Sequence, residues 1–136
     1  MLRVVFDPGV LVSAVIAPTG PPAEALDAWR SGEFDLIVSP KLLDELEDVL
    51  LRPKLRAYAS PEQASAYVDA LAAEALPFDD PADPPRLAPD PDDDYLIALA
   101  RAAGADLLVS GDKHLTDLAD PPVRVMTPGD LLARLP

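Results

Sequence analysis

Short apolar runs alternate with longer amphipathic segments along this chain, and this alternation constrains the fold more than any other feature. The runs are rich in valine, leucine and isoleucine and predict strands at residues 2–6, 35–38, 76–78, 107–109 and 123–126. The segments between them predict helices at residues 10–16, 22–31, 40–52, 60–75 and 95–103. Such alternation favours a three-layer α/β/α fold with a mostly parallel sheet of about five strands. At 136 residues, we expect one domain that spans 1–136.

Small polar residues mark where several helices begin. Ser39 and Thr127 each stand directly before a proline, as a helix-capping residue does when proline takes the first helical position. Ser60 and Gln63 have the spacing of a capping box. Residues 79–93 are rich in proline and aspartate and have too few apolar side chains to pack, so we expect a surface loop there.

The composition excludes several classes of protein. Cysteine is absent, which excludes a disulfide framework, a thiol nucleophile and a thiolate zinc site. The net charge of −13 disfavours a protein that simply coats nucleic acid. No apolar run reaches the ~18–20 residues of a membrane span, and the opening MLRVVFD is not a basic-then-apolar leader. We therefore expect a cytoplasmic protein without a membrane partner.

Acidic side chains stand where predicted strands end and where the following helices begin. In an open parallel sheet, the carboxyl ends of the strands and the helix N-termini beside them form one edge, so these side chains can converge. The acids in question are Asp7, Glu45, Asp92, Asp93, Asp94 and Asp112.

Clustered carboxylates indicate a particular chemistry. They repel one another unless a cation lies between them, and hard oxygen ligands suit Mg²⁺ or Mn²⁺. A cation held in this way lowers the pKa of a bound water and stabilises charge on a phosphoryl oxygen. The pattern therefore favours metal-dependent hydrolysis of phosphodiesters.

Each of these acids also has an ordinary structural interpretation. Asp7 can cap a helix, Asp112 can be a turn residue in Ser-Gly-Asp, and at least one acid of the 92–94 run complements a helix dipole. Glu45 and Glu47 flank the apolar stripe of their helix on opposite borders. Helical periodicity alone leaves open which of these two glutamates faces a site.

Four stretches of the chain resemble, in the same order, the motifs of the PIN-domain nuclease family. They are VVFD-x-x-VLVSA (4–14), WRSG-x-FDLIVSP-x-LL-x-EL (29–46), DPDDD-x-x-x-ALA (90–100) and LVSGDK (108–113). A TP-x-x-LL pattern follows at 127–132. The likeness covers nearly the whole chain and is greatest to the branch identified as toxins of toxin–antitoxin pairs, which is related to VapC ribonucleases.

The resemblance implies a role for each matching residue. The residues that match the family's four catalytic acids are Asp7, Glu45, Asp94 and Asp112. The resemblance thus selects Glu45 over Glu47, and it implies that the first, third and fourth acids hold the metal. Ser110 matches a hydroxyl residue that supports the acidic site, while Asp92 and Asp93 are adjacent acids that can bind metal through water.

The resemblance also implies an activity and partners. Family members cleave RNA with Mg²⁺ or Mn²⁺, so the chain is expected to be a metal-dependent endoribonuclease and the toxin of a toxin–antitoxin pair. The implied partners are an RNA substrate, an antitoxin protein that inserts a basic side chain near the acids, and a second copy of the chain in a homodimer.

One departure from the family pattern keeps alternatives open. The family usually has Thr-Asn after its first acid, whereas this chain has Pro8-Gly9, and the lost polar groups would weaken the orientation of Asp7. With the net charge, this motivates a PIN-like module that binds a protein or RNA without cleaving it. A third alternative is an aspartate-based phosphotransfer domain, because Asp7 and Lys113 both follow strands, but such folds need a second acid near the first.

The remaining candidates are basic or aromatic. One local basic cluster consists of Arg52, Lys54 and Arg56. It is either a contact for substrate phosphates or a solvated turn. We expect His114 to be exposed rather than catalytic, and Trp29 and Phe34 to belong to the core.

Overall fold

The strands form a parallel sheet. The computed structural model describes residues 1–82, 84, 86 and 91–136, and only the backbone of residues 91 and 92. The strands are β1 (Arg3–Phe6), β2 (Asp35–Val38), β3 (Leu76–Pro77), β4 (Leu107–Val109) and β5 (Arg124–Met126). They lie in the order β3-β2-β1-β4-β5, and every neighbouring pair is parallel. The predicted α/β fold with a parallel sheet of about five strands is therefore confirmed.

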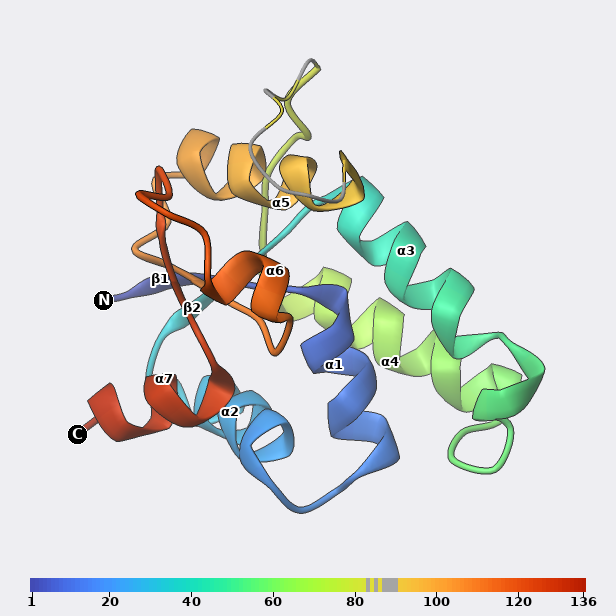
Figure 1. Ribbon diagram of the computed structural model, residues 1–136. Coiled ribbons are helices and arrows are strands. Elements are labelled where there is room, and N and C mark those ends of the chain that lie inside the picture. The colour runs from blue at the N-terminus through green and yellow to red at the C-terminus, as the bar shows by residue number, and fades with distance from the viewer. Residues whose placement is uncertain (83, 85, 87–90) are drawn as a thin grey trace.

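Helices cover both faces of this sheet. They are α1 (Pro8–Ile16), α2 (Pro21–Arg30), α3 (Pro40–Leu50), α4 (Pro61–Glu74), α5 (Pro91–Ala102), α6 (Lys113–Thr116) and α7 (Pro128–Arg134), with a 3-10 helix η1 (Pro53–Leu55). Helices α4, α3, α1, α2 and α7 pack in that order, each on the next, whereas α5 packs on β1 and β4. Figure 1 shows α5 on the opposite side of the strands from α1, α2 and α7.

The centre of the sheet is apolar on both faces because both faces are covered. Val4, Val5 and Phe6 of β1 are fully buried, and the register pairs Phe6 with Val109 of β4. Strands β1 and β4 therefore end side by side, and the residues that follow them emerge together at one edge of the sheet.

Several helices begin where the capping residues predict. The side chains of Ser39 and Thr127 each accept a backbone hydrogen bond at the start of α3 and α7. Ser60 and Gln63 form both hydrogen bonds of a capping box at the start of α4. These caps fix the ends of the helices that carry or support the candidate site.

Some boundaries differ from the prediction. Helix α5 begins at Pro91, so the expected loop at 79–93 ends earlier than predicted, because proline is well tolerated in the first helical turn. Residues 83, 85 and 87–90 of that loop lie outside the described residues. The short helix α6 and the 3-10 helix η1 are not predicted, since neither is long enough to show a helical period.

The aromatic side chains expected in the core are found there. Trp29 and Phe34 are buried, and both belong to the main hydrophobic cluster. Among the described residues, no helix is long and apolar enough to cross a lipid bilayer.

Candidate active site

Asp7 occupies the position where β1 ends and α1 begins. Its backbone N–H donates to the carbonyl of Val109 at 2.9 Å, which extends the pairing of β1 with β4. Its carboxylate Oδ1 accepts a hydrogen bond from the Gly9 N–H at 3.0 Å, so Asp7 caps α1. The prediction that Asp7 can cap a helix is therefore confirmed. The capping hydrogen bond holds the carboxylate at the edge of the sheet.

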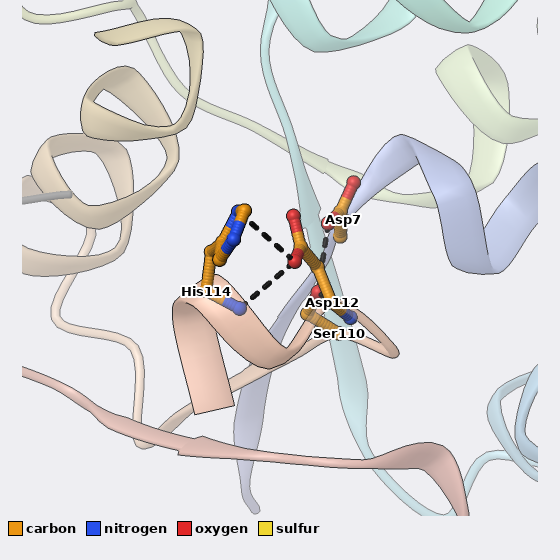
Figure 2. Close-up of polar contacts among 4 residues, drawn as sticks. All are labelled: Asp7, Ser110, Asp112 and His114. Atoms are coloured by element: carbon orange, nitrogen blue, oxygen red, sulfur yellow. Dashed lines mark hydrogen bonds and ion pairs between the residues drawn. The ribbon is translucent and has the colours of Figure 1, made fainter. Parts of the chain in front are cut away.

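Ser110 connects Asp7 to Asp112. The buried Ser110 hydroxyl donates to Asp7 Oδ2 at 2.8 Å and accepts from the backbone N–H of Asp112 at 3.0 Å. Figure 2 shows the two carboxylates next to each other above Ser110. Two acids that lie more than a hundred positions apart in the sequence thus meet at one edge of the sheet.

Asp112 both caps a helix and faces the edge. Its Oδ1 accepts from the N–H of His114 at 2.9 Å and lies 3.8 Å from His114 Nδ1 (Figure 2). The side chain of His114 is 68% exposed and that of Asp112 is 42% exposed. His114 is therefore exposed, as expected, and Asp112 keeps much of its carboxylate accessible to solvent.

Glu45 of α3 is hydrogen-bonded to Tyr95 of α5, on the other side of the sheet. The buried Tyr95 hydroxyl donates to Glu45 Oε2 at 2.7 Å. Burial raises the pKa of Tyr95, as do the hydrogen bond to Glu45 and the negative charges of Glu45, Asp7 and Asp80. The phenol accordingly stays protonated at neutral pH, and carboxylates from three separate segments lie around this one ring.

The acids line two adjoining recesses. The larger, of about 680 Å³, is lined by Asp7, Asp93 and Asp112 among others. The smaller, of about 290 Å³, is lined by Asp7, Asp93 and Glu45 among others. Because Asp7 and Asp93 line both recesses, the four acids share one continuous acidic cleft, and we use that name for the two recesses together.

The acids at the start of α5 are placed differently from one another. Asp93 lines both recesses, whereas Asp94 is 3% exposed and lines neither. The side chain of Asp92 lies outside the described residues. The geometry therefore favours Asp93 over Asp94 as the acid that α5 contributes to the acidic cleft.

Of the basic cluster, one member reaches the acidic cleft. Arg52 lines the smaller recess with Glu45, while the exposed Lys54 and Arg56 line neither recess. Among the described residues that line the two recesses, Arg52 is the one basic side chain.

The Pro8-Gly9 pair does not leave Asp7 without support. Both carboxylate oxygens of Asp7 accept a hydrogen bond, one from Gly9 and one from Ser110. A Cβ at Gly9 would lie 3.6 Å from Asp7 Oδ1, which is an ordinary contact. Backbone and Ser110 together thus hold the orientation that the Thr-Asn side chains are expected to support.

The donors in the acidic cleft suit a hydrated hard cation. Among the described residues, no three acidic or imidazole side chains are already arranged to hold a metal ion. Mg²⁺, however, commonly keeps several waters and is bound by only one or two carboxylates. Asp7 and Asp112, joined through Ser110, fit that mode of binding.

The contact between Tyr95 and Glu45 is not predicted from the sequence, which places Tyr95 only within a buried helix. The hydroxyl-bearing aromatic directly after the acid run is a weak signal. Its partner Glu45 lies fifty positions away, and no local pattern connects the two.

The comparisons with known proteins decide the family. The family model described as "PIN domain" matches residues 3–114. This chain belongs to the PIN domain family. The matched region of this PIN domain includes every acid of the cleft, and proteins of the family are generally nucleases.

Similar proteins are found in other organisms. The PIN domain chain is 30% identical over 119 residues to the uncharacterized protein MJ1680 of Methanocaldococcus jannaschii, a match that covers 88% of this chain and 76% of that protein. The crystal structure of PAE2754 from Pyrobaculum aerophilum has a TM-score of 0.66 at 17% identity, covering 98% of this chain and 88% of that one.

A further solved structure has the same fold. VapBC2 from Rickettsia felis, bound to a DNA fragment from their promoter, gives a TM-score of 0.65 at 14% identity, with 93% of this chain and 98% of that chain covered. At these identities, the solved structures establish the shared fold.

Proposed function

We propose that this PIN domain chain is a metal-dependent endoribonuclease, the toxin of a toxin–antitoxin pair. The observation that carries the proposal is the Ser110 bridge, which joins Asp7 to Asp112 where β1 and β4 end. Asp93 and Glu45 complete the same acidic cleft. The nuclease class agrees with the family to which the chain belongs.

The cleft residues have distinct roles in this proposal. Asp7 and Asp112 would hold Mg²⁺ or Mn²⁺, with Asp93, the α5 acid that lines both recesses, as the third ligand. When bound, the cation supplies a water of lowered pKa and neutralises charge on the phosphoryl group. Ser110 keeps Asp7 oriented through its hydrogen bond.

Two further side chains act on the substrate side of the smaller recess. Arg52 is placed to contact a phosphate of the RNA, because it lines the recess next to the acids and arginine pairs well with phosphate oxygens. Glu45, which lines the same recess, is the acid available to accept a proton near that phosphate.

The proposed protein partners are inferred from the charge of the acidic cleft and from the similarity to VapBC2. The VapBC2 neighbour is a two-component assembly by its name, and an acidic cleft favours a partner that inserts a basic side chain. We infer an antitoxin protein of that chemistry, and a homodimer of this chain in line with its resemblance to VapC ribonucleases.

The decisive experiment measures cleavage of a mixed RNA substrate with purified protein. Cleavage should require Mg²⁺ or Mn²⁺, stop with EDTA, and fall at least ~100-fold in Asp7→Asn, because a ligand of the cation that stabilises the transition state is lost. Asp93→Asn should lose activity to a similar degree with its folding intact. Asp94→Asn should act mainly on stability, since that carboxylate is buried.

The outcomes separate the competing functions. Full cleavage by both Asp7→Asn and Asp93→Asn would refute the nuclease assignment. A folded wild-type protein that neither cleaves RNA nor binds the cations would instead support the module that binds without cleaving.

A further inference from the structure

We propose that Tyr95 is a positioning residue that holds the Glu45 carboxylate at the acidic cleft. This inference rests on the proposed nuclease function and deepens it. The hydrogen bond from the Tyr95 hydroxyl to Glu45 Oε2 is 2.7 Å long, a distance typical of strong bonds between a hydroxyl and a carboxylate.

The bond joins two layers of the molecule. Tyr95 follows the acid run at the start of α5, while Glu45 lies on α3 and lines the smaller recess with Asp7, Asp93 and Arg52. Tyr95 itself is 2% exposed and lines neither recess. It acts on the acidic cleft through Glu45 and not by contact with substrate.

The tyrosine ring also contacts α3 through a lysine. Lys41 Nζ lies over the ring, 4.5 Å from its centroid, and Lys41 stands four positions before Glu45, so both project from one face of the helix. The backbone N–H of Lys41 donates to Asp80 Oδ2 at 2.9 Å, which ties this turn of α3 to the segment after β3. Burial of Tyr95, which is 2% exposed, limits the positions open to its hydroxyl.

A fixed donor matters because a glutamate side chain is long. Ordering it costs rotamer entropy, and a cleft carboxylate has to remain within about 0.5 Å of its productive position. The Tyr95 hydroxyl selects the conformation in which Glu45 points to the recess. Without it, that conformation of Glu45 is expected to be less populated.

The test compares two tyrosine variants that each lose one hydroxyl. Tyr95→Phe keeps the ring and removes the bond to Glu45, so kcat for RNA cleavage should fall about 10-fold, with KM little changed. Tyr67→Phe is the matched control, because the Tyr67 hydroxyl donates to the Leu11 carbonyl at 3.0 Å and Tyr67 lines neither recess. Its kcat should equal that of wild type.

A double-mutant cycle shows whether Tyr95 acts through Glu45. In a Glu45→Ala background, Tyr95→Phe should cause no further loss of kcat, whereas independent effects would multiply. Carbon-13 NMR of the glutamate carboxyls provides a readout other than activity. The Glu45 resonance, assigned from Glu45→Ala, should shift in Tyr95→Phe and stay in place in Tyr67→Phe.

The possible failures differ from one another. If wild type cleaves RNA and Tyr95→Phe cleaves equally well, or if the Glu45 resonance does not move, the positioning role is overturned and the nuclease assignment stands. If wild type does not cleave RNA, the proposed function fails, and the inference that depends on it fails too.

Discussion

Ser110 links the two acids at the end of the central strands. Its fully buried hydroxyl donates to Asp7 and accepts from the Asp112 backbone. Replacing it removes the hydroxyl that the Asp112 backbone N–H and the Asp7 carboxylate both contact. The orientation of both acids therefore depends on one small side chain.

Ser110→Ala should weaken Mn²⁺ binding and RNA cleavage by about 10–100-fold, the usual effect of removing a partner of a metal ligand. Calorimetric titration with Mn²⁺ and cleavage assays measure the two effects. Ser39→Ala is the control, because Ser39 is equally buried and caps α3. It should lose about 1 kcal/mol of stability with activity unchanged, and equal activity in the two variants would contradict the role of Ser110.

Individual site residues were predictable to different degrees. Asp7 and Asp112 could be placed because each directly follows a strand, and parallel strands share one carboxyl edge. Periodicity alone could not choose between Glu45 and Glu47, or between Asp93 and Asp94. Neighbouring positions on a helix point about 100° apart per residue, and the rotation of a helix about its axis is set by long-range packing.

Helices and strands were predicted best where capping chemistry marks their ends. The caps at Ser39 and Ser60 fixed the starts of α3 and α4, since a side-chain acceptor before proline or three residues before glutamine satisfies free backbone donors. Helix α6, at Lys113–Thr116, spans only four residues and has no period to detect. The start of α5 was misplaced because a run of proline and aspartate suits both a loop and a first helical turn.

The burial of one tyrosine between two helices makes the stability of the fold depend on pH. Tyr67 of α4 donates to the Leu11 carbonyl of α1, and burial, partly offset by the nearby charge of Arg30, raises the pKa of Tyr67 to about 12. In the unfolded chain a tyrosine has a pKa near 10. The protonated phenol of Tyr67 therefore stabilises the folded state fully below pH 10. This contribution is lost as the pH rises toward 12.

We expect the free energy of unfolding to fall between pH 10 and 12, with Tyr67 contributing roughly 1–3 kcal/mol of that fall. Urea unfolding followed by circular dichroism at a series of pH values measures it. Tyr67→Phe should flatten the slope, while Tyr58→Phe should not, since Tyr58 is 52% exposed. An identical slope in wild type and Tyr67→Phe would show that the buried hydroxyl makes no such contribution.

The net negative charge of the whole protein explains why RNA binding would need a cation. The net charge is −13, and Asp7, Asp93, Asp112 and Glu45 gather in one cleft, so an RNA phosphate approaching it meets repulsion. Arg52 is the one basic side chain among the described residues lining the cleft and cannot offset that charge alone. A bound divalent cation offsets much of that negative charge and places a positive centre beside the phosphate.

Crystals of the wild-type protein soaked in Mn²⁺, examined by anomalous diffraction, test this account most directly. The account predicts a manganese peak in direct contact with carboxylate oxygens of Asp7 and Asp112, and its disappearance in crystals of Asp7→Asn. A map without manganese at this edge of the sheet, under conditions in which the ion is in large excess, would contradict the proposal that these carboxylates gather to hold a cation.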